Sequence, residues 1–237
     1  IERALRREVS AERWTSLDRS LQRLQDERGL VDLRPDPSGH ARSDRALLIG
    51  RATALERLGL ADAHGQACWT LGSDLEGKLR ELGERGDIIK TMHRAMSRQL
   101  GSAETGRFAL HEEAPENPVI GRLIERGLHE ELTGESYAIV DGVDGRVHHL
   151  KFPDLEVTGD AEPGAIVELR SWDDNRGRRQ QSLALRSDLS LPGQVTANGA
   201  TWLDRQLVAA EPQITGGGFG IEVEQAKIAR AEHLAEQ

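Results

Sequence analysis

The hydrophobic period of this sequence changes from about 3.6 residues to two near Val119, and that change divides the chain. Five short alternating segments follow before residue 188, separated by Gly, Asp and Asn turn residues. They are VIGRLIERG, SYAIVDGV, RVHHLKF, AIVELRSW and QSLALRS. This pattern predicts a small five-stranded β-barrel over residues 119–188, OB-like or SH3-like, because closing a sheet removes its exposed edges.

Residues 1–100 show helical spacing instead. Leucines recur at helical intervals in residues 1–33, where Gly29 is expected to end a helix before a short strand. The stretch RALLIGRATALERLGLADAHGQACWTL predicts a helix, a stop at Gly59 and a hairpin that turns at His64-Gly65. A helix that ends in RLGLA and runs into a small hairpin is typical of winged-helix domains. We therefore predict a winged-helix-like domain over residues 1–100.

The rest of the chain connects and extends these two parts. Residues 101–118 have little periodicity and are expected to be a linker, whereas residues 189–237 read as a helical tail. The tail holds two helix candidates, GATWLDRQLVA and GIEVEQAKIARAEHLAEQ, joined by a TGGGFG segment that we interpret as a hinge. The predicted fold class is therefore α+β. Because the chain begins with Ile1, we expect it to be a piece of a longer protein.

Composition limits the class of protein. The formal net charge of −9 disfavours general nucleic-acid binding, so any such contact must be local. The single cysteine, Cys68, indicates a reducing, cytoplasmic compartment. No apolar run approaches the roughly 20 residues that span a bilayer, so no membrane insertion is expected.

Candidate catalytic and metal-binding residues are sparse. His148 and His149 are adjacent in a predicted strand and should point to opposite faces, so they are poorly placed to share one metal. The only tyrosine, Tyr137, lies in an apolar strand with no base nearby in sequence, and is most simply a packing residue. We expect no catalytic residue, no metal and no cofactor.

Basic residues suggest three places for nucleic-acid contact. A predicted hairpin, RSWDDNRGRRQQ, combines an aromatic side chain with cations, as single-strand binders do. The helix candidate after residue 41 would enter a groove if the domain is a true winged helix. The segment GERGDIIKTMHRAM is expected to break at Gly83 and Gly86 and to restart as a helix capped by Asp87, which would place its cations near a helix N-terminus. The candidate residues are Arg170, Trp172, Arg176, Arg178 and Arg179 in the hairpin, Arg42, Arg45 and Arg51 in the helix, and Lys90 and Arg94 in the last segment.

Each of these signals also has an ordinary structural explanation. Ile88, Ile89, Met92 and Met96 form a stripe that suits any amphipathic helix, with the polar residues facing solvent. Asp173 and Asp174 dilute the positive charge of the hairpin, which could be a solvated tip.

Several long strings resemble one bacterial family. RALLIGRATALERLGLA, LRELGERGDIIKTMHRAM, GRLIERGLHEELTGESYAIVDGVDGRVHHLKFPDLEVTGD and GATWLDRQLVA are similar to the C-terminal region of conjugative relaxases, the mobilisation nucleases that resemble the Ti-plasmid border-nicking enzyme. The resemblance runs from about Ala4 to Gln237, over a region of unknown function. Such relaxases nick DNA with an N-terminal domain that carries a tyrosine and metal-binding histidines, and those motifs have no counterpart in this sequence.

The resemblance implies a non-catalytic accessory region that assists DNA binding or recruitment to the plasmid-transfer machinery. A second hypothesis is a protein-interaction module that docks a conjugative coupling protein or secretion system without touching DNA, which suits the acidic balance. A third is an unrelated enzyme with a pocket between its domains, although no recognisable set of catalytic residues favours it.

Overall fold

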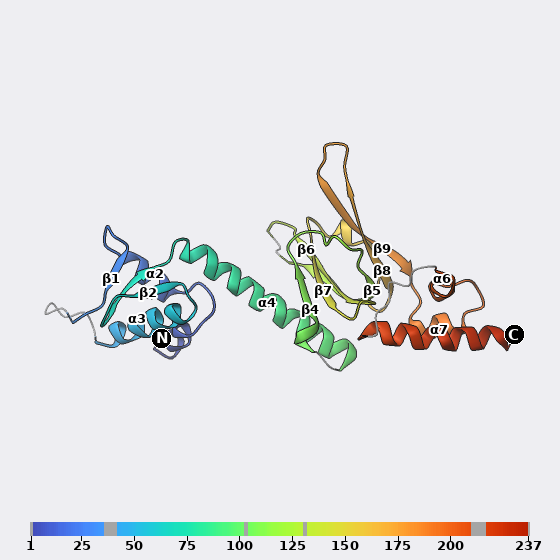
Figure 1. Ribbon diagram of the computed structural model, residues 1–237, viewed down its shortest axis with the longest axis horizontal. Coiled ribbons are helices and arrows are strands. Elements are labelled where there is room, and N and C mark those ends of the chain that lie inside the picture. Colours follow the sequence, from blue (N-terminus) through green and yellow to red (C-terminus); the bar gives the residue numbers. More distant parts are fainter. Residues whose placement is uncertain (1, 36–41, 102–103, 130–131, 210–216, 237) are drawn as a thin grey trace. The chain divides into compact units, whose positions relative to one another are not determined.

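The computed structural model describes residues 2–35, 42–101, 104–129, 132–209 and 217–236, with the side chains of residues 2–4, 42 and 43 excepted. The chain divides into two compact units, residues 1–88 and 89–237. Together they form a mixed α+β structure, as predicted (Figure 1). None of the helices in the described ranges has both the length and the apolar character that crossing a bilayer requires.

The first unit packs helices on a small antiparallel sheet. Its helices are α1 (Glu2–Val9), α2 (Ser16–Arg23) and α3 (Arg42–Arg57), followed by the start of α4. Its strands are β1 (Leu30–Asp32), β2 (Ala61–Ala63) and β3 (Cys68–Leu71), in the order β1-β3-β2. Gly59 follows α3 with a φ of 69°, and the β2–β3 hairpin turns through Gly65 as predicted.

The core of this unit lies between the helices and the sheet. Leu21 of α2 and Leu55 of α3 are fully buried against Trp69 and Leu71 of β3. The indole nitrogen of Trp69 donates a hydrogen bond to Glu56 Oε2 at 3.0 Å, so the aromatic ring is buried without leaving its polar atom unpaired. The first predicted helix was too long, because α2 ends at Arg23 and Gly29 instead lies in the turn before β1 with a φ of 77°.

The predicted break near Gly83 and Gly86 is wrong, because α4 is one continuous helix, Leu75–Leu100. Glycine weakens a helix by about 1 kcal/mol relative to alanine but does not end it. A Cβ at Gly83 would lie 2.9 Å from the Arg13 side chain, so the glycine permits close packing there. Asp87 accepts a hydrogen bond from Arg13 Nη2 at 2.8 Å and caps no new helix.

The second unit contains a six-stranded mixed sheet. All five predicted strands are present, as β5 (Ile120–Leu128), β6 (Ser136–Gly142), β7 (Val147–Phe152), β8 (Ile166–Asp173) and β9 (Arg179–Ser187). A sixth strand, β4 (Phe108–His111), follows the short 3-10 turn Thr105–Arg107 and pairs with β7 in parallel. It lies inside the segment expected to be a linker.

The prediction of a closed β-barrel is wrong. The sheet order is β4-β7-β6-β5-β8-β9, and within the described residues β4 and β9 are free edges that do not pair with each other. The sheet is open because β4 adds to the outer edge of β7 and β8–β9 diverges from the opposite side. Its buried face holds Leu123, Val140, Leu150 and Val167, which explains why these strands alternate in sequence.

The two helices predicted in residues 189–237 are present as α6 (Trp202–Val208) and α7 (Phe219–Ala235), and an unpredicted short helix, α5 (Leu191–Thr196), precedes them. A second short 3-10 turn, Glu156–Thr158, lies earlier in the unit. The three helices pack together around Leu203, Phe219 and Val223, against Ile166 of the sheet. The TGGGFG segment falls partly outside the described residues. In its described part, Phe219 is fully buried at the start of α7.

Candidate nucleic-acid interface

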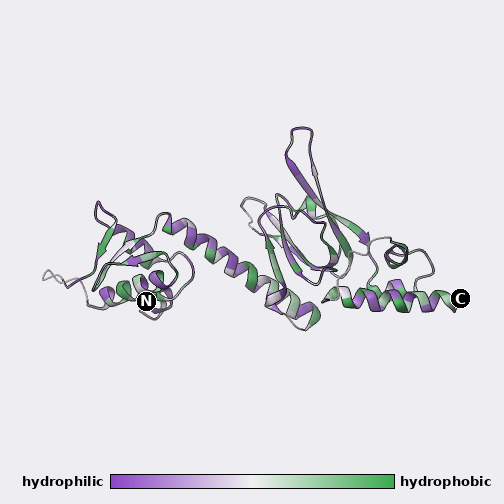
Figure 2. Cartoon of the chain, in the orientation of Figure 1, coloured by the Kyte–Doolittle hydropathy of each residue, from purple (hydrophilic) through white to green (hydrophobic). Residues whose placement is uncertain are grey.

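The most exposed of the predicted basic sites lies where β8 and β9 leave the sheet. β8 pairs with β5 only over Ile166–Glu168, whereas it pairs with β9 from residue 166 to residue 173. The outer half of β8 and β9 is therefore a two-stranded ribbon, visible in Figure 1 as a projecting hairpin. Its outer residues are almost all polar, as Figure 2 shows, and Trp172 is the exception. We call residues 169–183 the β8–β9 ribbon.

Trp172 is held open on one face of the ribbon. Trp172 is 48% exposed, and its cross-strand partner is the polar residue Gln180. Arg170 lies two residues before it and therefore projects from the same face. An exposed indole beside a guanidinium supplies the two kinds of group that hold a single strand: a flat surface for a base and a cation for a phosphate.

The ribbon tip is ordered by Asp174. Its Oδ1 accepts hydrogen bonds from the backbone nitrogens of Arg176 and Arg178 at 2.8 and 2.9 Å, and Arg178 Nε donates to Oδ2 at 2.9 Å. These bonds, the backbone N–H of Arg178 foremost, hold the pKa of Asp174 below its usual value. Asp174 therefore stays charged and fixes the turn, but it also engages one of the candidate cations.

The other arginines of the ribbon differ in how closely each is paired with a carboxylate. Arg179 lies opposite Asp173, on the face away from Trp172, with an Nη1–Oδ1 distance of 3.5 Å. Arg170 Nε is 4.0 Å from Glu168 Oε2, a carboxylate that also pairs with Arg186. Arg176 at the tip is exposed and makes no side-chain ion pair with any described residue. The predicted cluster is thus split across two faces, and Arg176 is its most available cation.

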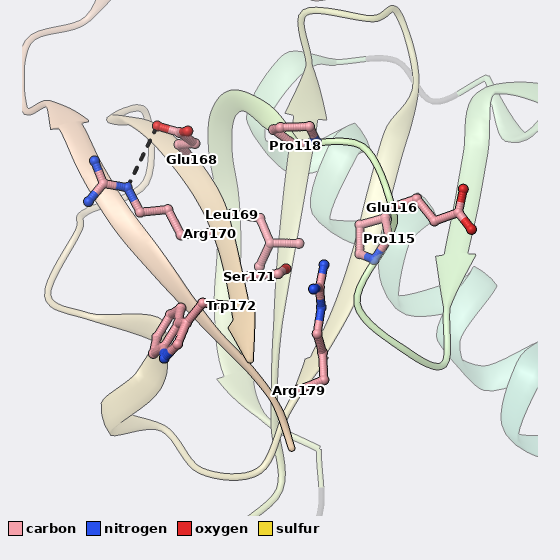
Figure 3. A pocket seen from close by; sticks show the side chains of 9 residues that line it. All are labelled: Pro115, Glu116, Pro118, Glu168, Leu169, Arg170, Ser171, Trp172 and Arg179. Atoms are coloured by element: carbon pink, nitrogen blue, oxygen red, sulfur yellow. Dashed lines mark ion pairs between the residues drawn. The ribbon is translucent and has the colours of Figure 1, made fainter. Parts of the chain in front are cut away.

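A shallow cavity of about 400 Å³ lies beside the base of the ribbon (Figure 3). Pro115 and Pro118 form one wall, and Leu169, Ser171 and Arg179 face them in the close-up. Arg170 and Trp172 are directed away from these prolines, at the margin of the cavity. A chain that crossed the ribbon would therefore meet a hollow of mixed polar and apolar lining on one side and the indole on the other.

The predicted contact residues of α3 are partly or fully buried where the structure describes their side chains. Arg51 is 0% exposed, so it cannot reach a phosphate, and its prediction as a DNA contact is wrong. Its Nε donates to Asp18 Oδ1 at 2.7 Å and its Nη2 to Asp18 Oδ2 at 2.9 Å. Arg45 donates to the carbonyl of Leu33 at 2.6 Å and is half-buried, whereas the side chain of Arg42 lies outside the described residues.

Lys90 and Arg94 are both exposed on α4, but the reason for choosing them does not hold. They lie in the second half of a helix that begins at Leu75, so no helix N-terminus adds its dipole to their charge. Met92 and Met96 are buried on another face of the helix, as an amphipathic helix predicts.

The sequence did not predict a network of ion pairs around the buried carboxylate of Asp141. Asp141, 1% exposed, accepts hydrogen bonds from Arg107 Nη2 at 2.7 Å and from Arg122 Nη2 at 3.0 Å. Arg122 also pairs with Glu222 and stacks over the ring of Phe219 at 4.5 Å. Gly218 has a φ of 48°, which favours glycine, and a Cβ there would have to displace the Arg107 guanidinium. The sequence signal was the carboxylate at the end of the apolar run YAIVDG.

His148 lies on one face of the sheet with His111, and His149 lies on the other face with Tyr137. His148 contacts His111 at 2.9 Å and Asp144 at 3.0 Å, whereas His149 stacks on Tyr137, so the predicted divergence of the two histidines is observed. Tyr137 donates to Glu125 Oε1 at 2.6 Å, and burial together with this bond raises the pKa of Tyr137. Among the described residues, no three His, Cys, Asp or Glu side chains are grouped to hold a metal ion.

Comparison with known proteins places the chain in a family. A family model described as "Protein of unknown function (DUF3363)" matches residues 48–181 and 169–237. The chain belongs to the DUF3363 family. The second matched range, residues 169–237, contains the whole β8–β9 ribbon and all of α5, α6 and α7. No curated protein and no solved structure matches the chain.

Proposed function

We propose that this DUF3363 chain is a non-catalytic accessory region of a conjugative relaxase, and that its β8–β9 ribbon holds single-stranded DNA during plasmid transfer in the cytoplasm. The resemblance of its long sequence strings to the C-terminal region of mobilisation nucleases supports the setting. The observation that carries the proposal is the projecting ribbon, on which Trp172 is 48% exposed with Arg170 on the same face and Arg176 at the tip.

The overall charge requires any DNA contact to be local. With a net charge of −9 the chain as a whole repels a polyanion, so DNA must meet a region where cations prevail. The ribbon projects such a region away from the acidic bulk of its own unit (Figure 1). A base stacked on Trp172 contributes about 1–3 kcal/mol, and it does so without sequence preference because every base has a flat face.

The first unit supports a second, weaker contact. Its β2–β3 hairpin follows α3, and its strands are ordered β1-β3-β2, which suits a winged-helix-like module. In helix-turn-helix proteins the recognition helix enters a groove of duplex DNA. Arg42 and Arg45 lie near the start of α3, and we infer that this end of the helix faces a duplex, because Arg51 further along is sealed inside.

The test is titration of labelled single-stranded and duplex oligonucleotides by fluorescence anisotropy at two salt concentrations. Trp172→Ala should weaken single-strand binding roughly 5- to 100-fold, because one stacking platform is lost. Arg176→Ala should lower the slope of log affinity against log salt by about 0.7, the value for one phosphate contact on a single strand.

Arg205→Ala is the matched control. Arg205 is an exposed arginine on α6, so this variant changes the net charge by the same amount without touching the ribbon. We expect its affinity to equal that of the unmodified chain. Equal weakening by Arg205→Ala and Arg176→Ala would show that only overall charge matters and would remove the ribbon from the proposal.

The acidic balance favours one competing function, the docking of a coupling protein or secretion channel without DNA. A protein interface with an apolar centre depends far less on salt than phosphate binding does. Chain that binds neither oligonucleotide at low salt but captures a purified coupling protein equally at both salt concentrations would favour that function instead.

A further inference from the structure

Two segments at opposite ends of the sequence repeat each other. TSLDRSL at residues 15–21 corresponds to TWLDRQL at residues 201–207, and IGRATAL at residues 49–55 corresponds to IARAEHL at residues 228–234. The first pair begins α2 and α6, and the second lies in α3 and α7. The order of the two motifs is the same in both regions.

The repeated residues make the same hydrogen bonds. Thr15 and Thr201 cap their helices in capping boxes with Asp18 and Asp204. Each aspartate receives two bonds from an arginine of the later helix, Arg51 in one region and Arg230 in the other. We call each such arginine, with its aspartate and its carbonyl partners, an arginine clamp.

The carbonyl partners also correspond. Arg51 donates to the carbonyls of Val9, Ala11 and Arg13, which are six, four and two residues before the capping threonine. Arg230 donates to the carbonyls of Val195, Ala197 and Gly199, at the same three positions before Thr201.

The preceding helices match as well. Glu8 and Gln194 occupy equivalent positions in α1 and α5, and each side chain accepts a backbone N–H from the first turn of the next helix, that of Ser16 or Leu203. The two arginine clamps make the same hydrogen bonds at the same positions relative to the capping threonine, which indicates that α1–α2–α3 and α5–α6–α7 are two copies of one three-helix module.

The two copies differ in what covers them. In the first copy, Leu21 and Leu55 are 0% exposed. They pack in one core cluster with Ala61, Trp69 and Leu71 of the β2–β3 hairpin. The equivalent residues of the second copy, Leu207 and Leu234, are 39% and 44% exposed. Ala52 is likewise buried, whereas its counterpart Ala231 is exposed.

We propose that the exposed α6–α7 face, formed by Leu207, Ala231 and Leu234, is a docking site for a polypeptide β-hairpin of the β2–β3 type, which presents apolar side chains and an aromatic ring on one side. The first copy shows this occupant in place on the same side chains. An anionic lipid surface fits poorly, because the exposed polar side chains of α7 include Glu222 and Glu232.

The experiment titrates the full chain with a backbone-cyclised peptide of residues 58–72, carrying Cys68→Ser, whose hairpin fold is first verified by NMR. Cyclisation is needed because an isolated two-stranded hairpin is marginally stable. We expect saturable binding and shifts of the methyl resonances of Leu207 and Leu234. Leu207→Asp and Leu234→Asp should each weaken binding at least tenfold, because a carboxylate would be buried without a partner.

Leu155→Asp is the matched control, since Leu155 is an exposed leucine elsewhere in the same unit, at 39%. Circular dichroism checks that each variant is folded, and methyl mapping on the unmodified chain gives a result that depends on no variant. Unchanged binding in both face variants, no methyl shift at saturating peptide, or dimerisation of the free chain through this face would each overturn the proposal.

Discussion

The two arginine clamps contain the same atoms in the same arrangement, yet one is sealed and the other is partly open. Arg51 and Asp18 both have fully buried side chains, whereas Asp204 keeps 23% of its side-chain surface exposed beside a buried Arg230. The repeated residues therefore make the same hydrogen bonds in both copies, and the elements that pack over them determine their dielectric surroundings. The same network should consequently differ in energy between the two copies.

The first test of this difference removes the aspartate of the sealed clamp. Asp18→Ala leaves a guanidinium with no charge partner inside the protein, which typically costs about 3–5 kcal/mol. We expect residues 1–88 to lose most of their stability, seen in denaturant titration and in hydrogen exchange of α2 and α3. A loss below about 1 kcal/mol would mean that the three carbonyl partners alone satisfy Arg51.

A pair of leucine truncations tests the covered and uncovered faces directly. Leu21→Ala opens a cavity in a fully buried core, and such changes cost about 2–5 kcal/mol. Leu207→Ala removes a side chain that is 39% exposed, so it should cost well under half as much. Equal losses in the two variants, measured by urea unfolding, would show that the α6–α7 face is already covered in solution.

The smallest effect is the pH dependence of the open clamp. The hydrogen bonds from Arg230, with those from Thr201, lower the pKa of Asp204 to about 2. Because the folded pKa is depressed, this stabilisation is complete above about pH 4 and is lost as the pH falls toward 2. We expect about 1–2 kcal/mol, allowing for partial solvent screening.

Thermal unfolding of the unmodified chain and of Asp204→Asn at pH 6, 4, 3 and 2 measures that contribution. The difference between the two melting temperatures should shrink between pH 4 and 2, because the other carboxylates titrate in both proteins. A difference that stays constant over this range would exclude a titrating Asp204 from the clamp.

Much of the fold follows from periodicity. The alternation after Val119 predicted all five strands from β5 to β9, because each has one face in the core. The β2–β3 hairpin and the helices α6 and α7 were also recognisable. Strand β4 was missed because FALH is short and pairs with a strand more than 30 residues away. Closure into a barrel was wrong for a related reason, since pairing of sheet edges leaves no local trace in the sequence.

The sequence predicted which kinds of residue form the candidate interface, but not how they are arranged. RSWDDNRGRRQQ identified a hairpin rich in cations, but its ion pairs and the separation of Arg179 from Trp172 depend on strand register. Arg51 was chosen for its charge, and only the packing of α2 against α3 shows that it is buried. The repeat itself was legible in TSLDRSL and TWLDRQL, although its meaning came from the matching hydrogen bonds.

The sequence by itself determined the elements and their local contacts: which segments alternate, which threonines cap helices, and which aspartate lies three residues after each cap. These depend on neighbours within a few residues, where spacing fixes geometry. Tertiary structure alone decided which arginines are buried, that the six-stranded sheet is open, and that one copy of the repeated module is covered while the other is exposed. Burial and edge pairing depend on contacts between segments far apart in the chain, and no local pattern encodes them.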